Sequence, residues 1–465
     1  MHSPAMIAVL IKDWIRESLW FQWLFSTLSI QLAKGQLRSG YTTASLDSLL
    51  RAWRSARRIS FPASGTRTFH RILESSCWNK GTLLPISSNL LLRDFNESDT
   101  AIGIRNRFAT FPPEDRVRLR LPRDDETPER QGNLIVLKQY NERTGERGVL
   151  LLKYGETFLW FAALFDLSRI AGEYSLVLEP CWSGYQDRRF LNYLGSDLTV
   201  VVQAPHPFDF DFISSLHSNL YPIRLGAGDW VDSRLFRPSA NQAPRYDLVM
   251  VSSWNPVKRH TDLFSALKTL NDSGYGPLRI ALVGSPTVWS RSKIESLIAR
   301  YGLTEWCTVY ENIPHKEVAA IVRSSKAFVL TSRQEGANKS LYEALFCDTP
   351  VLVCATHRSV NPDHIGPEVG IRFQPNRLHE GIRTILKDPN QFEPRDWAVR
   401  HTGWPVATDR LNKVLRNMEI EAGRPWTQDI VAKYNGPNLM YVDSETDQRF
   451  VPEYQRLRSR FATPM

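Results

Sequence analysis

Two glutamates in the stretch TSRQEGANKSLYEAL, residues 331–345, are spaced so that they could flank a single ligand. Glu335 lies on a predicted loop, and Glu343 lies about one turn inside a predicted helix. A carboxylate accepts hydrogen bonds from the hydroxyls of a diol such as a ribose, whereas it repels a phosphate. The pair therefore predicts a ligand with hydroxyl-rich groups on either side of the helix start.

The residues between the two glutamates suit an anion. Gly336 lets the backbone approach a ligand closely, and Asn338, Lys339 and Ser340 lead into the helix. The first turn of a helix presents free N–H groups and a partial positive charge, which together favour phosphate. A diphosphate at the helix start with a polyol on each side is the pattern that a nucleotide sugar requires.

The elements around this stretch alternate between apolar strands and helices. Strands are predicted at 133–138, 174–180, 197–205, 246–253, 278–284 and 350–354. This alternation predicts two units, each with a parallel sheet that helices cover on both faces. Ligands of such sheets bind beyond the carboxyl ends of the strands, so the expected site is the cleft between the two units.

The stretch resembles the donor-site signature of GT4-type retaining glycosyltransferases of the GT-B fold (glycosyl transferases group 1). The resemblance rests on S-x-x-E-G-x6-E-A followed by a Pro-Val strand, with Glu335 and Glu343 at the family's E-x7-E spacing. It implies that Glu335 contacts the donor sugar and is important for catalysis, and that Glu343 binds the nucleotide ribose. The resemblance is clear over about 225–375 and looser over 133–224.

A second segment, VSSWNPVKRHTDLF (251–264), is similar to the segment of this family that binds the donor diphosphate. Lys258 matches the family's diphosphate-binding lysine. Ser253 stands where the family usually has an arginine, so one cation of the pattern is missing. Arg259 and Lys339 are the two alternatives for the residue that supplies the missing charge.

Two residues of the first unit are further candidates by resemblance. His206 follows the strand LTVVVQAP, and these enzymes often have a histidine at such a strand end, facing the donor sugar. The alternative is a loop histidine that contacts no ligand. The loop at 141–148 resembles the family's glycine loop, in which Gly145 or Gly148 would let the backbone approach the donor phosphate or the acceptor.

These patterns predict an α/β protein of the GT-B fold, with two doubly wound Rossmann-like domains that face a cleft. The predicted parts are a basic N-terminal extension and connector (1–132), an acceptor-side domain (133–238), a donor domain (239–390), and a C-terminal helical segment and tail (391–465).

The basic character of the chain is concentrated at its N-terminus. The net charge is +9, and residues 1–93 contain 12 Lys and Arg against 4 Asp and Glu, a net charge of +8. Residues 6–58 combine Trp-rich apolar stretches with arginines, which predicts a peripheral contact with an anionic membrane surface. The alternative is a helix packed on its own domain. No apolar run is long enough to predict a transmembrane helix.

The five cysteines are scattered and form no zinc-binding spacing, so we expect no metal site and a reducing, cytoplasmic location. By resemblance, the reaction moves a sugar from a nucleoside diphosphate to the hydroxyl of a glycan or lipid-linked acceptor, with retention and without a cofactor or metal. The alternatives are a nucleotide-sugar epimerase of GT-B fold and a non-catalytic protein that binds a membrane surface or nucleic acid. The E-x7-E spacing disfavours the epimerase, and the apolar aromatic stretch at 6–32 disfavours nucleic acid, which we do not expect as a partner.

Overall fold

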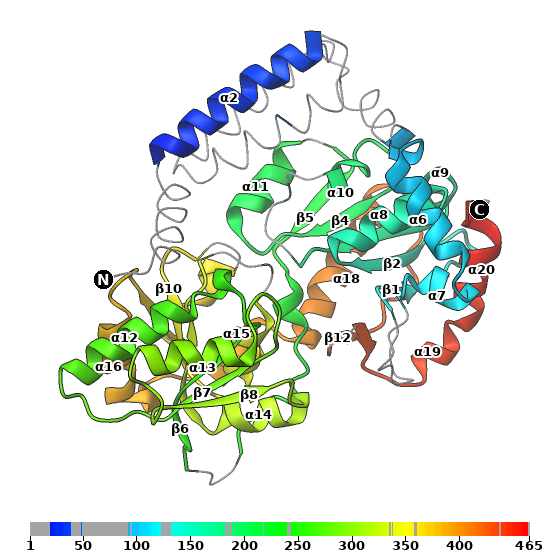
Figure 1. Ribbon diagram of the computed structural model, residues 1–465. Coiled ribbons are helices and arrows are strands. Elements are labelled where there is room, and N and C mark those ends of the chain that lie inside the picture. The colour runs from blue at the N-terminus through cyan, green and yellow to red at the C-terminus, as the bar shows by residue number, and fades with distance from the viewer. Residues whose placement is uncertain are drawn as a thin grey trace.

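The protein is described by a computed structural model, in which two α/β domains lie side by side and one long helix lies apart from both (Figure 1). The structure describes residues 19–38, 48, 92–93, 95–121, 132–181, 185, 188–216, 218–239, 243–333, 336, 338–357, 360–436 and 439–463.

The first domain is built on a sheet whose described strands run in the order β1-β2-β3-β4-β5. β1 is antiparallel to β2, and the other neighbours are parallel. The strands β1 to β4 are buried along their whole length because they are almost entirely apolar. Their bounds are β1 Leu134–Lys138, β2 Gly148–Lys153, β3 Tyr174–Glu179, β4 Val200–Gln203 and β5 Leu220–Ile223.

Helices from three separate parts of the chain cover this first sheet. Those between the strands are α8 Gly155–Leu164, α9 Leu167–Ala171, α10 Arg188–Leu191 and α11 Pro207–Ser215. Those before the sheet are α6 Asp99–Ala109 and α7 Pro113–Arg118. The C-terminal elements are α18 Trp404–Glu421, β12 Lys433–Asn435, β13 Leu439–Tyr441, α19 Thr446–Arg449 and α20 Val451–Phe461.

Two of the predicted domain boundaries are wrong as a result. Phe108 and Leu119 from the predicted connector, and Leu411 and Leu457 from the predicted tail, lie in one hydrophobic core with the first sheet. The prediction relied on the charged residues and prolines of these segments. A helix with one buried apolar face keeps its charged residues outside, so such composition does not distinguish a connector from a covering helix.

The second domain has a parallel sheet whose described strands run in the order β11-β10-β9-β6-β7-β8, so the strand order reverses between β6 and β9. The strands are β6 Tyr246–Val251, β7 Ile280–Gly284, β8 Cys307–Glu311, β9 Ser325–Leu330, β10 Val351–Cys354 and β11 Gly370–Phe373. The helices are α12 His260–Asp272, α13 Arg291–Arg300, α14 His315–Arg323, α15 Lys339–Phe346, α16 Leu378–Lys387 and α17 Pro394–His401. Short 3-10 turns are η1 Ala227–Trp230, η2 Pro256–Lys258, η3 Pro362–His364 and η4 Pro389–Gln391.

Alternate residues of this second sheet pack on opposite faces. Val249 and Phe328 lie in the core formed with α14, α15 and α17, whereas Leu248 and Val329 lie in the core formed with α12, α13 and α16. The alternation follows from the two-residue period of a strand. The predicted doubly wound arrangement, with helices on both faces, is therefore present in this domain.

The chain crosses between the domains at η1 and again at residues 402–403, and helix α15 contacts both crossings. A Cβ atom on Gly228 would lie 2.3 Å from the ring of Tyr342 on α15. A Cβ atom on Gly403 would lie 2.6 Å from the ring of Phe346, also on α15. Glycine at both positions lets the helix pack directly against the two crossings.

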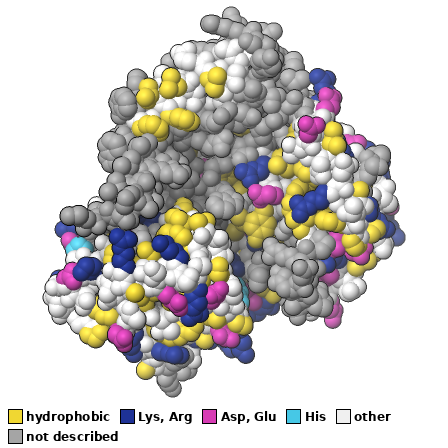
Figure 2. Space-filling view, viewed as in Figure 1, with side chains coloured by type: hydrophobic (Ala, Val, Ile, Leu, Met, Phe, Trp, Pro, Cys, Tyr) yellow, Lys and Arg dark blue, Asp and Glu magenta, His cyan; other side chains and the backbone are white. Residues whose placement is uncertain are grey.

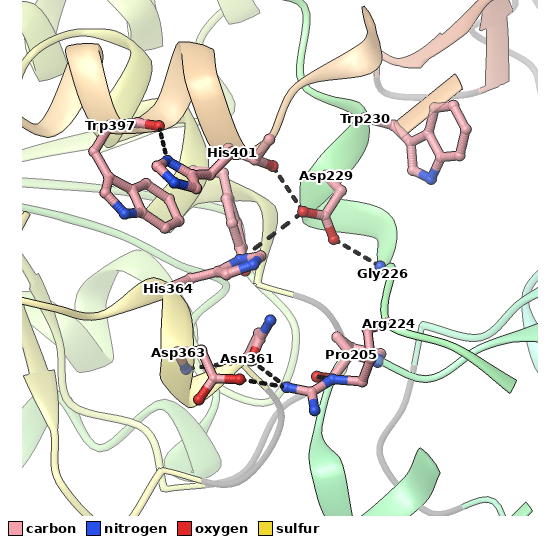
Figure 3. Close-up of polar contacts among 12 residues, drawn as sticks. Pro205, Arg224, Gly226, Asp229, Trp230, Asn361, Asp363, His364, Trp397 and His401 are labelled. Carbon is pink, nitrogen blue, oxygen red and sulfur yellow. Dashed lines mark hydrogen bonds and ion pairs between the residues drawn. The ribbon is translucent and has the colours of Figure 1, made fainter. Parts of the chain in front are cut away.

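A buried carboxylate ties the two crossings together (Figure 3). Asp229 accepts hydrogen bonds from the N–H of Gly226, at 2.8 Å, and from the hydroxyl of Thr402, at 2.7 Å. His364 Nδ1 lies 3.9 Å from Asp229 and 2.8 Å from the hydroxyl of Tyr342. Burial lowers the pKa of His364 although the Asp229 carboxylate opposes the shift, so the imidazole is neutral at pH 7.

Helix α2, Leu19–Arg38, lies apart from the two sheets (Figure 1). Hydrophobic side chains are visible in Figure 2 where α2 lies, and Phe25, Leu28 and Leu32 are exposed. Within the described residues, no helix is both long and apolar enough to cross a bilayer. Most of residues 1–93 lies outside the described residues, so the membrane contact stays a prediction.

Candidate nucleotide-sugar site

The predicted helix start at residues 338–340 lies where the strand order of the second sheet reverses. The hydroxyl of Ser340 donates to the carbonyl oxygen of Val251, the last residue of β6, at 3.1 Å. The hydroxyl of Thr331, which follows β9, donates to the carbonyl oxygen of Lys258 at 2.7 Å. The helix start, the end of β6 and the end of β9 are therefore held together at the position where parallel α/β sheets bind ligands.

Asn338 caps helix α15. Its side-chain oxygen accepts a hydrogen bond from the N–H of Leu341, at 2.8 Å, and lies 3.0 Å from the hydroxyl of Ser340. The cap fixes the first turn, and it leaves the N–H groups of the residues before Leu341 directed out of the helix end. This end can stabilise an anion.

Glu343 lies one turn inside α15 and is buried, with 4% of its side chain exposed. Its Oε1 atom lies 3.4 Å from Lys339 Nζ and 3.3 Å from His315 Nε2. Burial raises the pKa of the Glu343 carboxyl, but Lys339 and His315 more than offset this effect and hold the pKa below its usual value. Oε1 is therefore buried and faces both of these side chains.

The two candidates for the missing cation point in different directions. Arg259 adopts a left-handed backbone conformation, and its Nε atom donates to Asp262 of its own helix at 2.7 Å. Lys339 instead reaches across to the first domain, where its Nζ atom donates to the carbonyl oxygen of Gly436 at 2.8 Å. Burial lowers the pKa of Lys339, and the Glu343 carboxylate opposes the shift. Of the two, Lys339 is the one that faces the domain interface.

Four other predicted site residues remain without a demonstrated role. Glu335 lies outside the described residues, so its predicted contact with the donor sugar stays a prediction. Gly336 is half-buried beside it. His206 caps α11, and its Nδ1 atom accepts a hydrogen bond from the N–H of Phe208 at 3.2 Å. Lys258, half-buried, ends the turn η2 beside the end of β9.

The structure does not bring Gly145 to the domain interface. Gly145 lies in the turn that joins β1 to β2, and these two strands are antiparallel. Since β2 is parallel to β3, the turn lies at the amino ends of β2 and β3. The carboxyl ends of these two strands, which face the second domain, lie on the opposite side of the sheet. The glycine that does follow a strand at the interface is Gly155, just after β2. The sequence signal for it was the Lys-Tyr-Gly directly after the apolar run of β2.

Sequence reasoning also missed a buried polar group at the carboxyl ends of β2 and β3. Lys153 ends β2, Glu179 ends β3, and both are buried. Lys433 and Asn435 of β12 contact Glu179 from the C-terminal segment. For Lys153 and Glu179, the sequence signal was a charged residue at the end of an apolar run. Nothing near Lys433 in the sequence indicates that it returns to the first sheet.

Two α/β domains that meet at the carboxyl ends of their parallel strands, with the site at a strand-order reversal, define the GT-B class. Residues 232–398 match the family model described as glycosyl transferases group 1. The match to this family therefore covers nearly the whole second domain of this chain. No curated protein matches the chain.

Solved structures similar to this chain include the following three. Sucrose-phosphate synthase from Thermosynechococcus elongatus is 20% identical, with a TM-score of 0.47 over 59% of this chain and 74% of its own. Anabaena HepE in complex with UDP is 17% identical, with a TM-score of 0.40 over 59% and 78%. The pneumococcal O-GlcNAc transferase GtfA, in complex with UDP and GlcNAc, is 13% identical, with a TM-score of 0.44 over 55% and 54%. The match thus spans about half of the pneumococcal chain.

Proposed function

We propose that the protein transfers a sugar from a nucleoside diphosphate sugar to an acceptor hydroxyl, with retention of the anomeric configuration. The observation that carries the proposal is the geometry of α15. Its capped N-terminus lies at the reversal of strand order, and the buried Glu343 carboxylate lies one turn behind it. A diphosphate would bind the helix end, and the ribose hydroxyls would donate to Glu343.

The difficult step is cleavage of the bond between the anomeric carbon and the diphosphate oxygen. Negative charge then develops on the diphosphate, and positive charge develops on the sugar. The N–H groups at the start of α15, with Lys258, would stabilise the leaving diphosphate without a metal. Glu335 would orient the sugar hydroxyls, and closure of the two domains would exclude water, which competes with the acceptor.

A glycan or lipid-linked acceptor in polysaccharide synthesis at the cytoplasmic face of a membrane fits the N-terminal region. Helix α2 exposes Phe25, Leu28 and Leu32, and residues 1–93 carry a net charge of +8. An apolar face with basic residues nearby binds the surface of an anionic bilayer. We propose this peripheral contact as the means by which the protein would reach such an acceptor.

The donor site is tested with a panel of nucleoside diphosphates and their sugars. Binding is measured by calorimetry on the wild-type protein, Glu343→Gln and Glu335→Gln, with Glu295→Gln on the exposed side of α13 as the control. Loss of a charged acceptor for ligand hydroxyls weakens binding by about 10- to 100-fold, so Glu343→Gln should bind the nucleoside diphosphate that much less tightly. Glu335→Gln should retain binding and lose turnover.

Circular dichroism spectra of the variants check that the fold is retained, and NMR spectra of the product give the anomeric configuration. The control variant should match the wild-type protein in affinity and turnover. Unchanged affinity in Glu343→Gln would contradict the site, and an inverted product would contradict retention.

A further inference from the structure

A buried network of charges lies at the carboxyl ends of β2 and β3, on the first-domain side of the interface. Lys153 Nζ lies 3.9 Å from Glu179 Oε1, and Lys433 Nζ donates a hydrogen bond to Oε2 of the same carboxylate. The Asn435 amide donates to Glu179 Oε1 at 2.8 Å, and its oxygen accepts from Lys433 at 3.0 Å. Glu179 is therefore shared by two lysines and one amide.

Lys339 extends this network to the second domain. Its Nζ atom donates to the carbonyl oxygen of Gly436, directly after Asn435, at 2.8 Å. It also lies 3.4 Å from Glu343 Oε1 on its own helix. The end of β12 thus separates Lys339 from Lys433 and Glu179, and one continuous set of contacts joins the first-domain charges to the donor helix.

The network has more positive than negative charge. Three ammonium groups face two carboxylates, and no other described carboxylate pairs with any of the three lysines. The exposed fractions of the side chains are 5% for Lys153, 0% for Glu179, 0% for Lys433, 24% for Lys339 and 4% for Glu343. A buried charge without a counter-charge is costly, so an anion bound beside Lys339 would stabilise the network.

The stability of the fold alone does not explain why charged residues occupy these buried positions. Apolar residues of similar volume usually replace buried ion pairs with no loss of stability, and the strands β2 and β3 are apolar up to the last residue. Burial lowers the pKa of Lys433 to about 8 even though the Glu179 carboxylate opposes the shift, which indicates that its positive charge is held at a cost. A negatively charged ligand that binds here would explain why the lysines are present.

We propose that Lys153, Lys339 and Lys433 form a binding site for a phosphoryl group carried by the acceptor. The site lies on the first-domain side of Lys339, whereas the donor nucleotide is assigned to α15 and the end of β6. Lys339 contacts the phosphoryl oxygens directly, and the two buried lysines raise the local positive potential. The inference rests on the proposed transferase function, and it names the chemical class of the acceptor. A soluble sugar phosphate and a lipid-linked phosphate both carry the group.

The test measures binding of inorganic phosphate by thermal shift, with saturating nucleoside diphosphate present and chloride at equal ionic strength as the salt control. Phosphate should raise the melting temperature further, beyond the nucleotide effect. Half-saturation should need about tenfold more phosphate in Lys339→Met and in Lys153→Met. Lys339→Met loses the charge-assisted contact with phosphate, and Lys153→Met loses part of the positive potential at the site. The side chain of Lys339 is partly exposed, so Lys339→Met should fold even if a variant at a fully buried position does not. The exposed Lys293→Met is the matched control.

A second arm compares acceptors in the wild-type protein and in Lys339→Met. A hexose phosphate and a polyprenyl phosphate in detergent micelles are each tested against the unphosphorylated hexose or polyprenol. Preference for one phosphorylated compound identifies the source of the group, and the variant should lose that preference.

Competition between phosphate and the nucleoside diphosphate would show that the lysines serve the donor diphosphate, and it would overturn the acceptor site while leaving the proposed function intact. An equal phosphate response in all variants would also overturn it. A protein that binds no nucleotide at all would overturn both proposals.

Discussion

The two domains differ in how the chain builds them. The second domain is one continuous stretch, and its match to the family model, at residues 232–398, runs almost from one crossing to the other. The first domain combines the central segment with residues 95–121 and 404–463, which lie far apart in the sequence. Local sequence patterns therefore describe the second domain well, whereas the first depends on contacts that no local pattern contains.

The boundary between the two cores is narrow. Trp230 belongs to the first-domain core and Val231 to the second-domain core. Asp229, directly before them, hydrogen-bonds to Thr402 at the other crossing. The two domains are thus separate cores joined at one place, and substitutions can be assigned to one core or to the joint.

The largest expected effect comes from the C-terminal contribution to the first domain. Leu411 of α18 is fully buried in the first core, so Leu411→Ala should lower the free energy of unfolding by about 2–5 kcal/mol. Hydrogen exchange should rise in β1 to β4 and stay unchanged in β6 to β10. Leu263→Ala, an equally buried leucine of α12, should produce the opposite pattern.

Ile420, exposed on the same helix α18, is the matched control for Leu411. Ile420→Ala should change the free energy of unfolding by no more than about 0.5 kcal/mol. Faster exchange in the second sheet on Leu411→Ala would show that the tail does not belong to the first domain alone.

The contrast between the domains also explains what the sequence could predict. The helix start at Asn338 and the strand at 350–354 are local features, and their positions agree with the sequence patterns. Gly145 was misplaced because a hairpin and a strand–helix turn look alike when both contain glycine after an apolar run. Lys433 could not be predicted, because its partner Glu179 lies 254 positions away in the sequence. The residues alone predicted that Glu335 and Glu343 contact polyols, and the resemblance to the family added the assignment of Glu335 to the donor sugar and of Glu343 to the ribose.

A smaller effect is expected where α15 packs on the first crossing. Gly228→Ala would place a methyl group 2.3 Å from the Tyr342 ring. The neighbouring residues must shift to make room, which should lower the free energy of unfolding by about 1–3 kcal/mol. Since Tyr342 precedes Glu343, the shift of the helix should also weaken nucleotide binding. Gly103→Ala, on the open surface of α6, should be neutral or should stabilise the protein by about 0.5–1 kcal/mol. Normal nucleotide affinity in Gly228→Ala would show that the crossing does not position α15.

The smallest effect is expected at the surface contact between the domains. Arg224, after β5, lies 3.0 Å from Asp363 of η3, and the two side chains are 31% and 72% exposed (Figure 3). Exposed pairs contribute little, so Asp363→Ala should lower the free energy of unfolding by less than about 1 kcal/mol. This difference should vanish near 1 M salt, where the Debye length is about 3 Å.

Thr402→Val removes a hydrogen bond to the buried Asp229 and should lower the free energy of unfolding by about 1–3 kcal/mol at any salt concentration, because the carboxylate loses a partner that water cannot replace. Urea unfolding of both variants at low and high salt measures the difference. A larger cost for Asp363→Ala would mean that the surface pair, and not the buried Asp229, joins the two domains.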